Sequence, residues 1–224
     1  MSGRRQKTMM PSLLGAGVLL TVVVAAGAST AAAEPISFKL LPRYSYATFK
    51  SDAPLETVVG HTADTGLAGE LTVDPLKPQM ARGTVKVDMN TVRTGIDKRD
   101  ADMRAKPYLE TDQEGNRWVT FDVKSVEIAG PLEPGKATPA KIHGVLTVKQ
   151  KPVDRVADGT VTYIKLTPEQ VEQQKRFGFT SDNIKVRTKL ATTFTDHAMQ
   201  VPQLLILKLS NDIAIETDLT FIKQ

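Results

Sequence analysis

Apolar and polar residues alternate along most of the chain beyond residue 68, and this alternation limits the possible folds more than any other feature. In residues 69–74 and again in residues 84–89, the pattern is that of a strand with one buried face and one solvated face. It returns in five later segments: residues 118–123, 142–149, 160–166, 189–194 and 212–221. Seven or eight strands at this spacing predict an all-β chain, folded as a sandwich or a barrel.

Turn residues separate these segments, and two segments lack the alternation. Residues 97–105 contain no β-branched side chain and place Asp100 four positions before Arg104, so we predict a short helix with an ion pair between these two. Thr-Pro-Glu-Gln at residues 167–170 is a capping box, which predicts a second short helix reaching about Arg176. Pro, Gly, Asn and Asp gather at four places where we expect turns: residues 74–78, 114–116, 130–135 and 158–159.

The first 33 residues differ from the rest of the chain. Three basic residues precede an uncharged run from Thr8 to Ala33, which ends in three alanines. This layout predicts a cleaved signal peptide, residues 1–33, followed by one domain, residues 34–224, that is periplasmic or secreted. The uncharged run is also long enough to span a bilayer, so an uncleaved membrane anchor is the alternative.

Charge and cysteine content exclude several classes of protein. Three of the 29 basic residues lie in the predicted leader and none of the 25 acidic ones does, which leaves 26 basic residues against 25 acidic ones. The pI near 9.2 therefore reflects the leader, and a nucleic-acid surface is not indicated. The chain has no cysteine, so it forms no disulfide and offers no thiolate to a substrate or a metal.

Several short motifs resemble those of the YceI-like family of exported, lipocalin-like, isoprenoid-binding barrels. The most specific is Arg-Asp-x-x-Met-Arg at residues 99–104. The chain departs from the family pattern at residues 106–109, where the family has an acidic and aromatic pair, and in a longer excursion at residues 167–189. Four further segments are similar to the family in the same order: residues 69–75, 87–95, 118–121 and 142–153.

The resemblance implies an eight-stranded antiparallel lipocalin-like barrel with one or two short helices, holding an isoprenoid lipid of the quinone or polyprenyl phosphate type. It implies a carrier without a covalent cofactor, for which transient contact with a membrane is expected. Arg99, Arg104, Asp100 and His143 are the candidates for contact with the lipid's head group. The candidates for contact with its tail are apolar residues at expected inward positions: Val73, Val85, Val87, Met89, Phe121, Val123, Val148, Ile213 and Ile215.

Other interpretations stay open from the sequence. The same apolar residues could fill the barrel, and the chain would then be an anchored module that binds a partner through the surface of its sheet. A metal-dependent enzyme would need His61, His143 and His197 to converge, because the chain contains no HExxH or G-x-S-x-G motif. The motif at residues 99–104 allows a local ion pair, a ligand contact, or both. The oligomeric state is not fixed by the sequence.

Overall fold

The computed structural model of the chain describes residues 1, 3, 34–62, 65–204 and 207–224. The predicted leader therefore lies almost entirely outside the described residues. Among the residues that are described, no helix is long and apolar enough to cross a bilayer.

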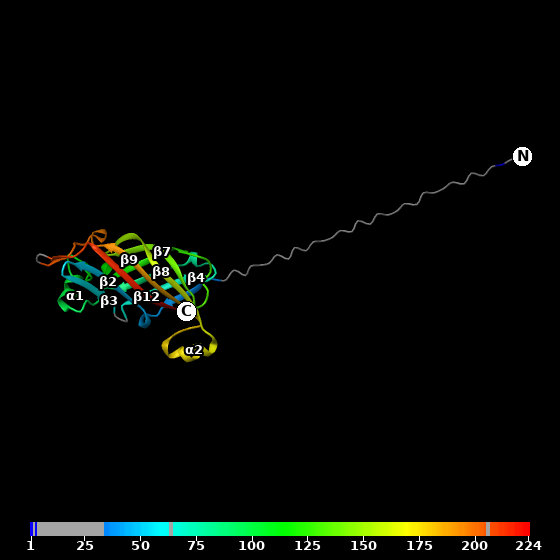
Figure 1. Ribbon diagram of the computed structural model, residues 1–224, viewed down its shortest axis with the longest axis horizontal. Helices are drawn as coiled ribbons and strands as arrows, with labels where there is room; N and C mark the ends of the chain where they lie inside the picture. Colours follow the sequence, from blue (N-terminus) through cyan, green and yellow to red (C-terminus); the bar gives the residue numbers. More distant parts are fainter. Residues whose placement is uncertain (2, 4–33, 63–64, 205–206) are drawn as a thin grey trace. The chain divides into compact units, whose positions relative to one another are not determined.

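Eight antiparallel strands form a closed barrel (Figure 1). The last of them, β12, pairs with the first, β1, and this pairing closes the ring. The predicted all-β fold and the implied eight-stranded barrel are confirmed. In order around the barrel the strands are β1 (Ile36–Leu40), β4 (Leu67–Val73), β5 (Arg82–Asp88), β6 (Trp118–Ile128), β7 (Ala137–Val148), β8 (Lys151–Lys165), β9 (Asp182–Thr193) and β12 (Asp212–Lys223).

Two further strands extend the wall at one end of the barrel. β2 (Tyr46–Ala53) pairs with the first half of β12, beside the second half that pairs with β1, and β3 (Glu56–His61) pairs with β2. β3 pairs with β2 on one side. On its other side, among the described residues, His61 forms an isolated β-bridge with Arg93, and the two exchange backbone hydrogen bonds of 2.9 and 3.0 Å. A small separate hairpin consists of β10 (Gln203–Leu204) and β11 (Leu207–Lys208).

Both predicted short helices are present, at opposite ends of the barrel (Figure 1). They are α1 (Asp97–Arg104) and α2 (Pro168–Gln174). α2 begins with the expected capping box, in which Thr167 and Gln170 each accept a hydrogen bond from the other's backbone N–H. A 3₁₀ turn follows α2 and ends at Gly178, whose φ of 85° lies in the left-handed region.

The ion pair predicted between Asp100 and Arg104 is wrong. Both side chains turn toward the segment that precedes α1, where Thr94 donates to Asp100 and backbone carbonyls accept from Arg104. Spacing along a helix brings two side chains near each other, but stronger partners outside the helix decide where they bond.

The turn expected at residues 158–159 is also wrong, because both residues lie inside β8. Gly159 is needed for a different reason: a Cβ at this position would lie 1.9 Å from the backbone oxygen of Arg187 on β9. The reversal between β7 and β8 is made instead by Lys149 and Gln150, whose φ values are 49° and 58°. Two successive residues in the left-handed region form the type of tight turn that suits a twisted hairpin.

Apolar side chains inside the barrel form two clusters. One surrounds Phe38 on β1 and Phe221 on the paired strand β12, and both residues are fully buried. The other includes Met89 and Val92, which follow β5, and Leu109, which follows α1. Each cluster borders one of two adjoining cavities.

Candidate functional site

The two cavities lie end to end inside the barrel. The inner chamber has a volume of about 130 Å³ and the outer chamber one of about 630 Å³. Ala47, Val87, Val119 and Ile215 line both chambers, so the chambers meet where these four side chains lie. The barrel is therefore not filled by its own side chains.

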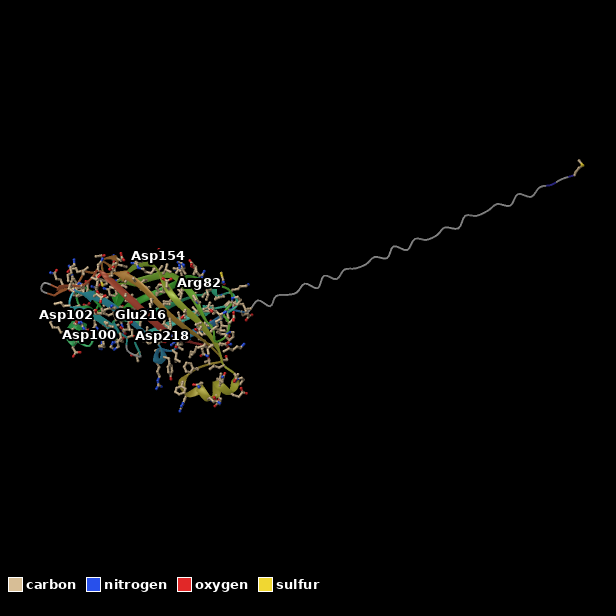
Figure 2. All side chains as sticks on the ribbon, viewed as in Figure 1. Arg82, Asp100, Asp102, Asp154, Glu216 and Asp218 are labelled. Carbon is tan, nitrogen blue, oxygen red and sulfur yellow. The ribbon has the colours of Figure 1, made fainter. Side chains whose placement is uncertain are left out.

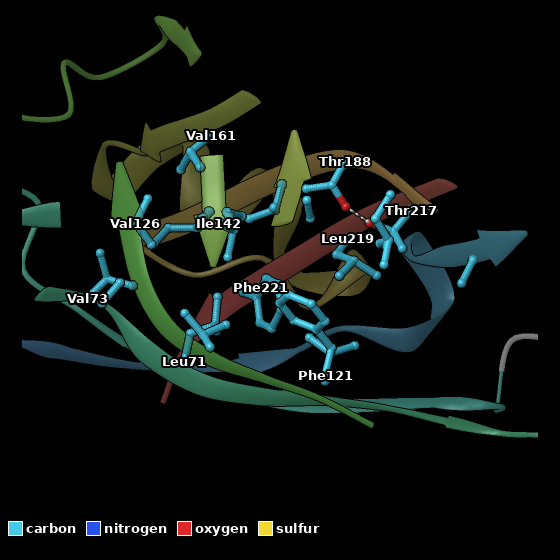
Figure 3. Close-up of a pocket in the computed structure, with 18 of the residues that line it drawn as sticks. Leu71, Val73, Phe121, Val126, Ile142, Val161, Thr188, Thr217, Leu219 and Phe221 are labelled. Atoms are coloured by element: carbon cyan, nitrogen blue, oxygen red, sulfur yellow. Dashed lines mark hydrogen bonds between the residues drawn. The ribbon is translucent and has the colours of Figure 1, made fainter. Parts of the chain in front are cut away.

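The inner chamber is almost wholly apolar. Aliphatic side chains and the rings of Phe121 and Phe221 surround it (Figure 3), and the polar residues among those that line it are three threonines, Thr120, Thr188 and Thr217. Leu132, on the loop between β6 and β7, is buried against this chamber, and its backbone N–H donates to the carbonyl oxygen of Pro75 over 2.7 Å. This loop closes the inner end of the barrel.

The outer chamber combines an apolar wall with a charged rim. Its wall includes Phe49, whose ring lies over Gly60, where a Cβ would come within 2.1 Å of the ring. Five charged side chains border the chamber, from β3 and from the chain around α1: Glu56, Lys98, Arg99, Asp102 and Lys106. A ligand with an apolar chain and a polar end would meet matching surfaces in this cavity.

Arg99 holds α1 against the β2–β3 hairpin. Its Nε donates to Thr94 Oγ1 over 2.9 Å, its Nη2 donates to the Thr94 carbonyl oxygen over 3.0 Å, and its Nη1 donates to Glu56. The structure therefore places this head-group candidate at the rim, where these three bonds engage three of its five N–H donors. Its contact with a ligand stays a prediction.

Asp100 and Arg104 do not line either chamber, although both lie on the helix at the rim (Figure 2 labels Asp100). Asp100 is buried and accepts from Thr94 N–H over 2.8 Å and from Thr94 Oγ1 over 2.5 Å. Burial alone would raise the pKa of Asp100, but the two bonds from Thr94 and the nearby charge of Arg104 lower this pKa below its usual range. Arg104 donates to the carbonyl oxygens of Met89 over 3.3 Å and Val92 over 2.6 Å. These two residues hold the rim segment in place.

His143, the fourth head-group candidate, lies away from both chambers. It is on the outer side of β7, where its Nε2 lies 2.6 Å from Oε1 of Glu127. The structure does not bring it together with Arg99.

The three histidines have separate surroundings. His61 ends β3, and His197 is fully buried and lines the outer chamber. The Nδ1–H of His197 donates to the carbonyl oxygen of Lys151 over 3.0 Å, so its Nε2 accepts from the Thr192 hydroxyl over 2.7 Å. Burial lowers the pKa of His197, which keeps its ring neutral. In the part of the chain that the structure describes, no three metal-ligating side chains gather at one place.

The nine tail candidates all line a chamber. Val73, Val85, Phe121 and Val123 line the inner one, Met89, Val148 and Ile213 line the outer one, and Val87 and Ile215 line both. Strand alternation correctly placed them on the inner face of the barrel. Whether a ligand touches them stays a prediction.

Sequence reasoning missed several residues of the site. Lys106 borders the rim, and its side chain makes no hydrogen bond within the described part of the chain. Its position two residues after the Arg-Asp-x-x-Met-Arg motif was a usable signal. Phe49 and Phe194 belong to the outer wall. Phe49 lies in a segment without clear alternation, whereas Phe194 ends the alternating segment at residues 189–194 and was not named as a candidate.

Solved structures with this fold include Burkholderia cenocepacia BcnA, with 12% sequence identity, a TM-score of 0.58, and coverage of 81% of this chain and 98% of that chain. A polyisoprenoid binding domain from Saccharophagus degradans, implicated in plant cell wall breakdown, is similar with 16% identity, a TM-score of 0.59 and coverage of 84% and 99%. The YceI protein of Campylobacter jejuni is similar with 16% identity, a TM-score of 0.57 and coverage of 76% and 86%. No similar sequence is found among the curated proteins.

The sequence itself matches the YceI-like domain over residues 38–221. This range reaches from β1 to β12 and includes the Arg-Asp-x-x-Met-Arg motif on α1. The resemblance carried by the short motifs is thus confirmed over most of the chain. The chain belongs to the YceI-like domain family.

Proposed function

We propose that this chain is a non-enzymatic carrier that holds an isoprenoid lipid, of the quinone or polyprenyl phosphate type, inside its barrel after export. The observation that carries the proposal is the pair of adjoining apolar chambers behind a charged rim. The polyisoprenoid binding domain among the structures of similar fold supports the same class of ligand. The lipid's tail occupies the chambers, and its head lies at the rim beside α1.

The size and chemistry of the outer chamber suit such a tail. Its volume of about 630 Å³ falls within the range of pockets that bind small molecules. Burying apolar surface contributes roughly 25 cal/mol per Å², so a long hydrocarbon chain supplies most of the affinity without specific polar contacts.

The ionisable groups near the chambers favour binding over catalysis. Among the described residues, those that line the inner chamber carry no charge, and the charged ones of the outer chamber lie at its rim. His197 faces the outer chamber, but both of its ring nitrogens are engaged by Thr192 and Lys151. A histidine that acts as a general base needs a ring nitrogen within reach of its substrate's proton, and His197 has none to offer.

Mass spectrometry of an organic extract tests the ligand class directly. The protein should be purified from its native source without detergent, and we expect a polyprenyl lipid in a ratio near one per chain. An extract without any isoprenoid, from protein that also fails to bind one after purification, would contradict the proposal and favour the anchored interaction module.

Tail length provides a second test. The delipidated protein should bind quinones and prenyl phosphates more tightly as the tail grows, by about fourfold for each added CH₂, since each contributes about 0.8 kcal/mol until the cavity is full. Val148→Phe would fill part of the outer chamber and weaken binding, whereas Thr147→Phe, on the opposite face of β7, is the matched control. Affinity that ignores tail length, or equal effects of the two variants, would contradict a ligand inside the barrel.

Export can be tested by itself. The secreted or periplasmic protein should begin within a few residues of Glu34, as N-terminal sequencing of fractionated cells would reveal. A membrane-bound protein that still begins at Met1 or Ser2 would favour the anchored alternative.

A further inference from the structure

The inner chamber contains a polar feature that a plain hydrocarbon tail would not use. Thr188 on β9 and Thr217 on β12 are in register, and their hydroxyl oxygens are 2.8 Å apart. Both side chains line the chamber, and Figure 3 shows them pointing toward each other among apolar neighbours. Thr188 is only 8% exposed, so its hydroxyl is shielded from bulk water.

This pair of hydroxyls has one more donor than it uses. Each threonine hydroxyl carries one hydrogen and two lone pairs. One of the two hydrogens makes the bond between the side chains, and the other has no acceptor among the described residues. Buried hydroxyls nearly always have partners for their hydrogens, because an unpaired donor in an apolar site is unfavourable. The pair therefore presents a hydrogen-bond donor to the occupant of the chamber.

The wall beside the pair leaves room for that occupant. On the neighbouring strand β2, Ala47 is in register with Thr217. Its side chain does not extend beyond Cβ. Ala47 also lies where the two chambers meet, so a chain that enters through the outer chamber passes close to the two hydroxyls.

We propose that Thr188 and Thr217 form a subsite that donates a hydrogen bond to an uncharged oxygen of the bound lipid, such as a carbonyl, ether or hydroxyl oxygen. The proposal rests on the proposed function, since it concerns the same cavity. A charged oxygen does not fit, because no cation lines the inner chamber among the described residues and an unpaired anion is strongly disfavoured there. The oxygen belongs either to a neutral head that enters first or to the far end of a chain whose head stays at the rim.

Two pairs of C₂₀ isoprenoids distinguish these sources. Geranylgeranyl methyl ether and the hydrocarbon of the same skeleton differ by one neutral oxygen at the head. Geranylgeranyl diphosphate and its 16-methoxy derivative share a charged head that remains at the rim, and they differ by one oxygen at the chain end. Dissociation constants are measured for the wild type, for the double variant Thr188→Val with Thr217→Val, and for the double variant Thr188→Ser with Thr217→Ser, which keeps both hydroxyls.

In at least one pair, the wild type should bind the member with the extra oxygen about three- to tenfold more tightly, as one hydrogen bond allows. A preference in the first pair indicates a neutral head that enters first, which keeps the lipid in the barrel but reverses the orientation proposed above. A preference in the second pair indicates an oxygen at the chain end and keeps that orientation. The valine variant should bind both members of a pair equally, and the serine variant should keep the wild-type preference.

Equal wild-type affinities within both pairs, or a preference that survives in the valine variant, would overturn the subsite and leave the carrier proposal standing. Failure of all four compounds to bind would count against both proposals.

Melting of the ligand-free proteins is a second measurement. Replacing both hydroxyls by methyl groups of similar shape should leave the melting temperature of the valine variant equal to or above that of the wild type. A clear decrease would mean that the protein satisfies both hydroxyls itself, which also overturns the subsite.

Discussion

The two ends of the barrel are closed by different kinds of contact. At the inner end, the Tyr163 hydroxyl donates to Asp182, and these residues are 6% and 7% exposed. At the rim, Arg99 donates to Glu56, and their side chains are 27% and 49% exposed. A buried hydrogen bond to a charged group contributes more to stability than an exposed ion pair, which water screens. We therefore expect the contact between β3 and α1 to open at a lower free-energy cost than the contact between β8 and β9.

Backbone hydrogen bonds tie both ends, so the contrast between the ends lies in the side-chain contacts. The loop that closes the inner end is tied at Leu132, which donates to Pro75 over 2.7 Å, and at Gly135, which donates to Tyr163 over 2.8 Å. At the rim, the edge of β3 is joined to the chain before α1 by the bridge between His61 and Arg93. Because the side-chain contact between Arg99 and Glu56 is exposed, a ligand that enters or leaves is expected to pass between β3 and α1.

The largest effect is expected where the two chambers meet. Val87→Trp should block the inner chamber, whose volume of about 130 Å³ approaches that of cavities that hold a benzene ring. About five carbons of a long tail would then be excluded, which removes about 4 kcal/mol, or about a thousandfold in affinity. Titration with isoprenoids of increasing length should give wild-type affinity for short chains and a growing deficit for long ones.

Lys86→Trp is the control, because Lys86 is exposed on the outer side of the same strand. It adds the same bulk and should leave binding unchanged. If Val87→Trp weakened short and long ligands by the same factor, the chambers would not act as separate compartments for the tail.

The next effect concerns the inner end. Tyr163→Phe removes the donor to a buried carboxylate, so the free energy of unfolding should fall by about 1.5–3 kcal/mol. For a domain of this size the melting temperature should fall by roughly 3–12 °C. Tyr108→Phe, at the outer chamber, is the matched control and should have little effect. Equal losses in the two variants would contradict the contrast between the ends.

The dependence on pH sharpens this test. Burial alone would raise the pKa of Asp182, but hydrogen bonds from Tyr163, Ser181 and Lys223 lower it. A carboxyl whose pKa is lowered by folding stabilises the protein above its unfolded pKa of about 3.9, and the contribution is lost as the pH falls below that value. Chemical unfolding should therefore show a large difference between wild type and Tyr163→Phe at pH 7 that narrows below about pH 4. A difference that grew in acid would assign the effect to another group.

The alternation of apolar and polar residues predicted the strands whose inward residues are apolar, and it missed strands whose inward residues are small or polar. On β5, Val85 and Val87 alternate with exposed Lys86, and the strand was predicted. On β2, the inward residues include Ala47 and a buried Ser51, so the apolar period is lost and no strand was predicted before residue 69.

The candidate site also has a part that the sequence predicted and a part that it did not. Inward tail positions follow from the pleat of a strand, because alternation is a local property. The partners of polar side chains can lie far away in the sequence: Arg99 meets Glu56, which is 43 residues away, and Thr188 meets Thr217, which is 29 residues away. A single sequence reveals the face on which a residue lies but not the residue that it meets across the barrel.

A smaller effect is expected for cations at the rim. Lys106 borders the outer chamber and makes no side-chain hydrogen bond within the described residues, whereas Lys98 is paired with Asp102 at 2.9 Å. Lys106→Gln should therefore weaken binding of a prenyl diphosphate by up to about fivefold at low salt, and Lys98→Gln should weaken it less. The loss should shrink at 1 M salt, which screens exposed charges. Equal losses for both lysines would mean that the pairing seen at the rim does not decide which cation meets the head.

The smallest effect on stability, and the most direct test of the contrast between the ends, is expected from Glu56→Gln. The change weakens the exposed contact with Arg99 and should alter the free energy of unfolding by no more than about 1 kcal/mol. If the rim opens for the ligand, release should accelerate by up to about fivefold, because the same contact is absent from the open state. Stopped-flow displacement of a fluorescent prenyl ligand measures this rate. Glu133→Gln weakens another exposed ion pair, that with Lys136 on the loop at the inner end, and should leave the rate unchanged. Faster release in Glu133→Gln than in Glu56→Gln would place the exit at the inner end instead.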